Sequence, residues 1–212
     1  MEKIHFDETT YIWKTKLNRI NDKSLFLKEA YSVMNSMPDI TTDGWEYTKY
    51  DNNINFIGDI HIGNILDEVV QLGINICKKL YTESSNNIFN KINTDSWINM
   101  VRSKNPVQDN FHNGNKYHTH TEINKQMKSF VSDYTYVYYI QMPDIMNEKD
   151  GVLYFKGKND KEYWIRPQED DFIIMPGDMP HAPNNAPNST IDRIVLAGNV
   201  GFEFVKKEKS LI

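Results

Sequence analysis

Residues 151–183 read GVLYFKGKNDKEYWIRPQEDDFIIMPGDMPHAP, and this stretch decides the fold. It contains four runs rich in Tyr, Val, Ile and Phe, which turn-forming residues such as Asn159-Asp160 and Pro176-Gly177-Asp178 separate. Short apolar and aromatic runs between turn residues are typical of β-strands. We therefore expect strands over 151–156, 161–166, 171–175 and 179–183.

The same pattern continues on both sides of this stretch. Turn-forming residues, among them those at 113–115 and 183–190, again separate short apolar runs. Strands that follow one another without intervening helices favour a sandwich or barrel over a parallel sheet with crossover helices. The additional strands are expected at 96–102, 116–122, 134–142 and 191–204.

The first third of the chain has a helical period instead. Between Asp22 and Met37, apolar residues recur at spacings of three and four, and Pro38 ends the run. A second helix is expected from Asn64 to Tyr81, where five apolar residues form one stripe: Ile65, Val69, Leu72, Ile76 and Leu80. We expect both helices to brace the outside of one sheet.

The composition is that of a globular protein with a sizeable core. Of the 212 residues, 39% are hydrophobic and 12% aromatic, which is enough apolar surface for one large domain. We expect a single domain over residues 1–212. Within it, residues 1–95 form the helical support, with strand material in 44–57, and residues 96–205 form the β-core.

Charge and cysteine content exclude several classes of protein. The 29 acidic and 24 basic residues give a formal charge of -5, so we expect no bulk nucleic-acid binding. Cys77 is the only cysteine, which excludes an internal disulfide and a thiolate metal cluster. No apolar stretch resembles a signal peptide or reaches the roughly 18 residues that cross a bilayer. We therefore expect a cytoplasmic protein with no membrane partner.

His118, His120 and Glu122 alternate along the strand expected at 116–122. Alternate side chains of a strand share one face, so these three would point the same way. Burying two imidazoles and a carboxylate without partners is costly, and a divalent cation would remove that cost.

A second group of polar residues surrounds His181. This histidine follows the turn at 176–178, and Arg193 lies twelve residues later on an apolar strand. A guanidinium among apolar neighbours favours binding of a bidentate anion. The neighbours expected on its face are Ile191, Val195 and Ala197.

The spacing of His120-x-Glu122, His181 and Arg193 is that of a metal site with two histidines and one carboxylate. Three ligands on one side of iron leave three positions open, two for a chelating keto acid and one for dioxygen. The arginine would bind the far carboxylate of a dicarboxylate cosubstrate.

At this point the chain resembles the iron(II)/2-oxoglutarate-dependent oxygenase superfamily, and within it the prolyl-hydroxylase-like and phage-type members. The resemblance covers residues 97–204 and rests on the order and spacing of several motifs. They are Tyr117-x-x-His120-x-Glu122, Tyr136-Val-Tyr-Tyr-Ile-Gln-Met-Pro143, Gly151-Val-Leu-Tyr-Phe155, Ile165-Arg-Pro167, Asp171-Phe-Ile-Ile-Met-Pro176 and Arg193-Ile-Val-Leu-Ala-Gly-Asn199.

The resemblance implies a mainly β fold, the double-stranded β-helix or jelly roll that cupins share. It implies that His120, Glu122 and His181 hold iron(II), that Arg193 binds the C5 carboxylate of 2-oxoglutarate, and that Tyr138 contacts the same cosubstrate. The implied reaction hydroxylates a small molecule or peptide while 2-oxoglutarate is decarboxylated to succinate, with ascorbate as reductant. Substrate specificity would lie in the loops 104–115, 123–133 and 144–150.

Three positions leave other interpretations open. Glu122 replaces the family's usual Asp, and Val195 stands where some members carry a hydroxyl that binds the cosubstrate. His118 is an additional candidate ligand, so a cupin-type metalloenzyme that uses His118, His120 and His181 without a keto acid is an alternative. A non-enzymatic β-helix that acts as a binding module is the third possibility.

Overall fold

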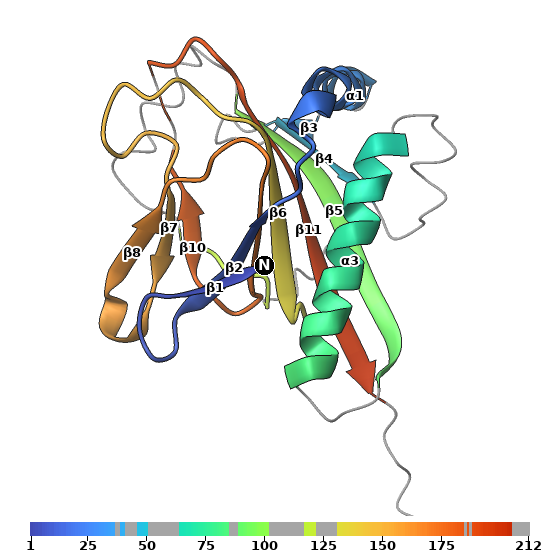
Figure 1. The fold of residues 1–212 in the computed structure, drawn as a ribbon, viewed down its shortest axis with the longest axis vertical. Helices are drawn as coiled ribbons and strands as arrows, with labels where there is room; N and C mark the ends of the chain where they lie inside the picture. The colour runs from blue at the N-terminus through green and yellow to red at the C-terminus, as the bar shows by residue number, and fades with distance from the viewer. Residues whose placement is uncertain are drawn as a thin grey trace, which may run out of the picture.

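The computed structural model describes residues 1–36, 39–40, 46–50, 64–84, 89–101, 117–121, 131–184, 186 and 188–204. Within these ranges the chain forms two antiparallel sheets that lie opposite each other (Figure 1). The larger sheet has the strand order β1 (Glu2–His5), β2 (Tyr11–Lys16), β9 (Asp171–Pro176), β6 (Tyr134–Gln141), β11 (Arg193–Phe204), β5 (Phe89–Val101), β4 (Glu46–Tyr50) and β3 (Asp39–Ile40). The smaller sheet has the order β10 (His181–Pro183), β7 (Leu153–Lys156) and β8 (Glu162–Ile165).

Residues 117–121 extend the smaller sheet at β10. His118 forms an isolated β-bridge with His181, in which each backbone N–H donates to the other's carbonyl at 3.1 Å. From β5 onward the chain therefore alternates between the two sheets. The strands β5, β6, β9 and β11 lie in the larger one, and residues 117–121, β7, β8 and β10 lie in the smaller one. This alternation is the double-stranded β-helix, so the predicted fold class is confirmed.

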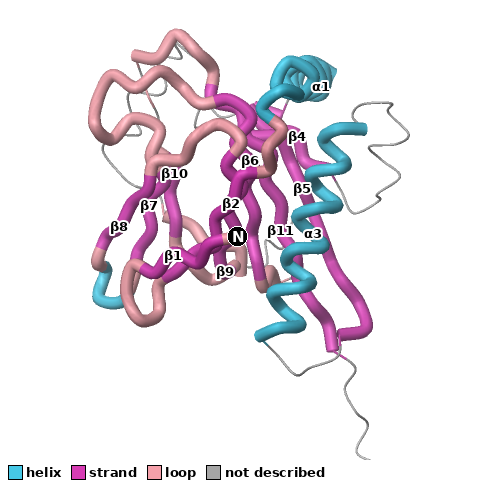
Figure 2. Tube along the Cα trace, in the orientation of Figure 1, coloured by secondary structure: helices cyan, strands magenta, loops and turns pink. Residues whose placement is uncertain are grey.

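Two helices cover the outer face of the larger sheet, as predicted (Figure 2). A 3-10 turn, η1 (Ile20–Asp22), leads into α1 (Lys23–Ser36), and α3 (Asn64–Ser84) follows later. The stripe predicted for α3 is buried at Ile65, Val69 and Leu80, whereas Leu72 is 38% exposed. No helix in the described ranges combines the length and the hydropathy needed to cross a bilayer.

Strand β6 supplies both cores of the molecule because its side chains alternate between the two faces of the sheet. Tyr136 and Tyr138 point toward the helices and join a core with residues such as Phe26. Val137 and Tyr139 point into the space between the two sheets, where they pack with Phe155 and its neighbours. Two successive tyrosines, 138 and 139, therefore serve different layers.

Strands β1 and β2 were not predicted, because the first third was expected to be mainly helical. Strand β2 pairs with β9 and closes one side of the larger sheet. Its alternate residues Lys14 and Lys16 form ion pairs with the fully buried Asp171, with N–O distances of 2.7 and 3.3 Å. Ile12 of this strand is also fully buried, but the apolar run Tyr11-Ile12-Trp13 is short, so the local signal is limited.

Other predicted strands agree with the structure to within a few residues, with two differences. Strand β5 begins at Phe89 instead of 96. In place of the strand expected over 116–122, the described residues 117–121 form only the bridge at His118. Residues 51–57 and the loop 104–115 lie outside the described residues, as do 122–130, which include Glu122 and most of the loop 123–133.

A connection between β7 and β8 is made by η3 (Lys158–Asp160), the turn that Asn159-Asp160 predicted. The loop 144–150, expected to contribute to specificity, is described and is tied to the residues that precede β11. Thr190 donates to the Asp144 carboxylate from its backbone N–H at 3.1 Å and from its hydroxyl at 2.7 Å. Asp150 in turn accepts from the backbone N–H groups of Met146 and Asn147.

Candidate metal and anion site

A cavity of about 370 Å³ lies between the two sheets. Both sheets and the 117–121 segment contribute to its wall, so the fold itself brings together residues that are far apart in the chain. The lining residues are Trp97, Asn99, Tyr117, His118, His120, Thr135, Val137, Tyr139, Leu153, His181, Ala182, Pro183, Asn184, Arg193, Val195 and Ala197.

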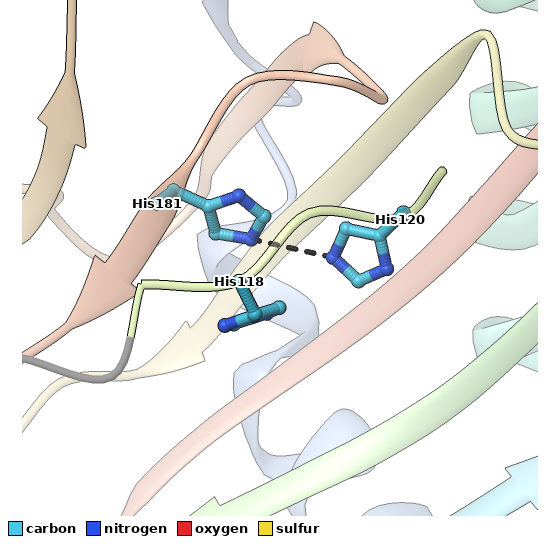
Figure 3. A group of neighbouring side chains, drawn as sticks. All are labelled: His118, His120 and His181. Atoms are coloured by element: carbon cyan, nitrogen blue, oxygen red, sulfur yellow. Dashed lines mark hydrogen bonds between the residues drawn. The ribbon is translucent and has the colours of Figure 1, made fainter. Parts of the chain in front are cut away.

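Three imidazoles converge in this cavity (Figure 3). His118, His120 and His181 can each offer one ring nitrogen such that all three nitrogens lie within 4.8 Å of one another. The Nε2 atoms of His120 and His181 are 3.3 Å apart. The ring of His118 lies 4.4 Å from that of His181 and 5.1 Å from that of His120, measured between centroids. Such spacing is suited to one divalent cation bound by all three rings.

His181 is oriented by the backbone. The β-bridge to His118 sets its position, and its Nδ1 lies 3.0 Å from the carbonyl oxygen of Met179. A carbonyl can only accept a hydrogen bond, so Nδ1 carries the proton and the lone pair is on Nε2. A hydrogen bond on the far nitrogen is the usual way in which a metal-binding histidine is held.

His120 is held by the turn that precedes β10. Its backbone N–H donates to the carbonyl of Gly177 at 2.8 Å, and its carbonyl accepts from the N–H of Ser132 at 3.3 Å. The Gly177 N–H donates to Asp133 at 2.9 Å. A Cβ at Gly177 would lie 2.0 Å from the Ser132 carbonyl oxygen, so only glycine fits between these segments.

Burial keeps two of the clustered imidazoles, those of His120 and His181, neutral. It lowers the pKa of His120 from 6.5 to about 2, and the neighbouring His181 and His118 lower it further. Burial likewise lowers the pKa of His181 to about 3, with His118 contributing in the same direction. Neutral imidazole is the form that binds metal ions, so His120 and His181 present free lone pairs at physiological pH.

Arg193 is a buried cation in the same cavity, with 5% of its surface exposed. Its Nη1 donates to the Asn99 side-chain oxygen at 3.4 Å, and its Nε has no hydrogen-bond partner among the described residues. No Asp or Glu belongs to the described lining. A buried guanidinium without a carboxylate partner is costly, and an anionic ligand would supply the missing charge.

Tyr139 lies beside this arginine. The Arg193 guanidinium carbon is 5.6 Å from the centroid of the Tyr139 ring. The tyrosine is fully buried, and burial raises the pKa of its hydroxyl to about 12 while the Arg193 charge opposes the rise. The hydroxyl therefore stays protonated and can donate to an anion bound at Arg193.

The structure brings three of the five predicted site residues together, namely His120, His181 and Arg193. It places Tyr138 on the opposite face of β6, where its hydroxyl donates to Asp170 at 3.2 Å and its ring packs on Phe26. Tyr138 therefore does not line the cavity. Glu122 lies outside the described residues.

Several lining residues were not predicted from the sequence. Trp97 and Asn99 of β5 lie opposite Ala197 and Val195 of β11, so they share the face of Arg193. The Trp97 ring lies 5.8 Å from the ring of His120. Because side chains alternate along β6, Tyr139 faces the cavity and Tyr138 faces the helices. Both signals need the strand register, which the sequence pattern alone does not provide.

Comparison with known proteins finds similarity in fold only. No protein-family model and no curated protein matches the chain. Among solved structures, it is similar to a Pseudomonas putida prolyl-4-hydroxylase, with 12% identity, 92% of this chain and 94% of that chain covered, and a TM-score of 0.54.

Two further structures share the fold. One is a Trichoplax adhaerens prolyl hydroxylase in complex with a hypoxia-inducible-factor peptide fragment, with 10% identity, 91% and 84% coverage of this chain and that one, and a TM-score of 0.59. The other is the dioxygenase for auxin oxidation 1 from Arabidopsis thaliana with 2-oxoglutarate, with 12% identity, 89% and 82% coverage, and a TM-score of 0.54. The chain thus has the fold of 2-oxoglutarate- and iron(II)-dependent oxygenases.

Proposed function

We propose that this protein is a non-heme iron(II)- and 2-oxoglutarate-dependent oxygenase that hydroxylates a small-molecule or peptide substrate. One observation carries the proposal: three imidazoles that could hold a metal ion line the same cavity as a buried arginine, which has no acidic partner among the described residues. The first feature suits a metal ion, and the second suits a carboxylate on a ligand that also reaches the metal.

We assign the metal to His118, His120 and His181. Their donor nitrogens already lie close together, and the Met179 carbonyl orients one of them. This set differs from the one implied by the resemblance, in which Glu122 is the third ligand. Three imidazoles on one side of a metal ion would leave its other positions to ligands within the cavity.

We assign the anion site to Arg193 and Tyr139. The guanidinium would bind the C5 carboxylate of 2-oxoglutarate, and the Tyr139 hydroxyl would donate a further hydrogen bond. Bound iron and keto acid would supply the oxidising power needed to place one atom of O2 in succinate, with loss of CO2, and the other in a C–H bond of the substrate. The residues of the cavity would hold and orient the reactants, and ascorbate would keep the iron reduced.

Arg193 favours this proposal over the two rivals. A cupin-type metalloenzyme without a keto acid would use the histidines and leave the arginine without a ligand. A binding module that takes no metal would leave three imidazoles crowded together without a role. Only a ligand that joins the metal to a distant carboxylate uses both groups.

The proposal is tested by spectroscopy without oxygen. Protein loaded with iron(II) and excess 2-oxoglutarate should show a weak visible charge-transfer band, which Arg193→Leu should weaken at equal keto-acid concentration while retaining iron. Admission of air with ascorbate present should then release succinate slowly, even without a prime substrate. If wild-type protein gives neither band nor succinate, the oxygenase proposal is wrong.

A further inference from the structure

We infer that Asn99 is a specificity-determining residue of the anion site, because it holds Arg193 through a neutral group and so leaves the guanidinium charge to the ligand. This inference rests on the proposed function, in which Arg193 binds the far carboxylate of 2-oxoglutarate. None of the motifs that carry the sequence resemblance contains Asn99.

The position of Asn99 follows from the strand register. Asn99 lies on β5 directly opposite Val195 of β11, two residues along from Arg193. Residues in such diagonal positions on one face of a sheet are close enough for long side chains to touch. The Arg193 Nη1 donates to the Asn99 oxygen at 3.4 Å, and both residues line the cavity.

The chemistry of the pair fixes which end of the amide faces the arginine. A guanidinium has only donors, so the Asn99 oxygen must face it. The amide NH2 group is then the remaining polar group of Asn99. Arg193, the Tyr139 hydroxyl and this NH2 group are all hydrogen-bond donors, and a carboxylate has only acceptors.

The neutrality of Asn99 is the decisive property. An amide oxygen orients the guanidinium but leaves its charge uncompensated. An aspartate at the same place would have nearly the same shape and would form a buried ion pair with Arg193. That pair would satisfy the arginine internally, and an incoming carboxylate would have to compete with it and would be repelled by it.

Asn99→Asp and Asn99→Leu separate charge from shape. Titration of 2-oxoglutarate by calorimetry, with Zn(II) in place of iron, should show an affinity loss of about a hundredfold or more for Asn99→Asp. Asn99→Leu removes the hydrogen bond without adding a charge and should lose affinity by about tenfold at most. Zn(II) affinity should be the same in all three proteins, and the Tm of the metal-free Asp variant should exceed that of wild type.

The outcomes distinguish this inference from the proposed function. If wild-type protein does not bind 2-oxoglutarate, the proposed function fails and the inference fails with it. If the wild type and Asn99→Asp bind equally well, only the inference is overturned. Equal losses in the Asp and Leu variants would also overturn it, because shape would then be the cause. So would an unfolded Asp variant, because the inference requires the carboxylate to form a buried ion pair with Arg193 in the folded protein.

Discussion

His118 and Glu122 stand two residues to either side of His120, and a facial metal site needs only one of them. His118 converges with the other two imidazoles in the described structure, whereas Glu122 lies outside the described residues. A neutral third ligand would leave the metal with one more unit of positive charge than a carboxylate would. The identity of this one ligand therefore sets the charge of the site as well as its affinity.

Metal binding to single variants distinguishes the two sets. We expect His118→Ala to lose iron(II) affinity by more than the 10–100-fold that is typical when only a residue supporting a ligand is lost. Glu122→Ala should keep near-wild-type affinity, and His120→Ala should be as defective as His118→Ala. Measured iron content and titration with Co(II), followed by its visible spectrum, would report this. Loss of metal in Glu122→Ala with retention in His118→Ala would restore the two-histidine, one-carboxylate set.

Arg193→Leu should weaken binding of the cosubstrate without weakening binding of the metal. Loss of a charged hydrogen-bonded pair in a dry cavity costs about 2–5 kcal/mol, so the affinity for 2-oxoglutarate should fall tens-fold or more while metal affinity is unchanged. Arg166→Leu is the matched control, because Arg166 donates to the Glu148 carbonyl and does not line the cavity. An unchanged affinity for 2-oxoglutarate in Arg193→Leu would mean that another residue binds its far carboxylate. A loss of that affinity in Arg166→Leu would indicate Arg166.

Much of the site could be predicted from single residues, and the limits have a physical cause. His181 and Arg193 stand out because a polar residue beside a turn or on an apolar strand needs a partner. The choice between Tyr138 and Tyr139 depends on which face of β6 each occupies, and both faces of that strand are buried. A strand buried on both faces has no alternation of polar and apolar residues, so its sequence does not reveal which residues face the cavity.

At the scale of elements, the turn 176–178 connects β9 to β10 and also carries the segment of His120. The Gly177 carbonyl accepts from His120, and the Gly177 N–H donates to Asp133. The turn thus links β10 to the segment 117–121 and to the residues just before β6. Its geometry should influence the metal site without contributing a ligand.

Gly177→Ala should therefore weaken metal binding as well as stability. The added Cβ meets a backbone oxygen at 2.0 Å, and overpacking of this kind costs about 1–3 kcal/mol. Gly73→Ala is the control, since its Cβ would crowd the Tyr136 ring at 3.0 Å on the helix side of the sheet. Both variants should have a lower Tm, but only Gly177→Ala should lose metal affinity. Equal metal affinity in Gly177→Ala and Gly73→Ala would mean that the turn 176–178 does not position His120.

Asp67 at the start of α3 and Glu29 on α1 form an acidic pair with a pH-dependent effect on stability. Burial raises the pKa of Asp67 from 3.8 to about 6, and the charge of Glu29 on α1 adds to the rise. The folded state thus binds the Asp67 proton more tightly than the unfolded chain does. Its stabilising effect is fully present below pH 3.8 and is lost as the pH rises through about 6.

Asp67→Asn should consequently raise the Tm at pH 7 and flatten the dependence of Tm on pH between 4 and 6. Glu83→Gln, near the exposed end of α3, is the control and should leave this dependence unchanged. Asp67 also lies in the first turn of α3, where the helix dipole favours a negative charge. A lower Tm of the Asn variant at pH 7 would mean that this attraction outweighs burial and the repulsion from Glu29.

At the scale of the whole molecule, the metal would join parts of the chain that are otherwise held by few bonds. Two backbone hydrogen bonds link His118 to His181, and the segment 117–121 has no longer ladder to β10 within the described residues. A metal bound by all three histidines would act as a cross-link at this place.

Metal binding should therefore stabilise the fold. A ligand that binds only the folded state adds about 2.7 kcal/mol at a free concentration of one hundred times its Kd. We expect Zn(II) or Fe(II) to raise the Tm of wild-type protein, a chelator to reverse the rise, and His181→Ala to show none. A Tm of wild-type protein that does not respond to metal would contradict the three-histidine site.

Most of the fold could be predicted because the β-core has strong local signals. The runs 134–142, 171–175 and 191–204 combine aromatic and β-branched residues with clear turns, and each corresponds to an observed strand. Strand β1 has no such signal, and β2 has only the short run Tyr11-Ile12-Trp13. Their place in the sheet depends on a distant partner, the buried Asp171 on β9, which no local window of sequence contains.

The alternation along β6 has a consequence for how this protein can change over generations. Adjacent positions on that strand have different roles: residues 136 and 138 pack beneath the helices, where the Tyr138 hydroxyl also donates to Asp170, whereas residues 137 and 139 shape the cavity. Substitutions at even positions are limited by side-chain volume and by this hydrogen bond, while substitutions at odd positions are limited by the chemistry of the cavity. A deletion of one residue at the start of β6 would exchange the two sets and harm both at once. Lineages should therefore tolerate substitutions in this strand far more readily than changes in its length.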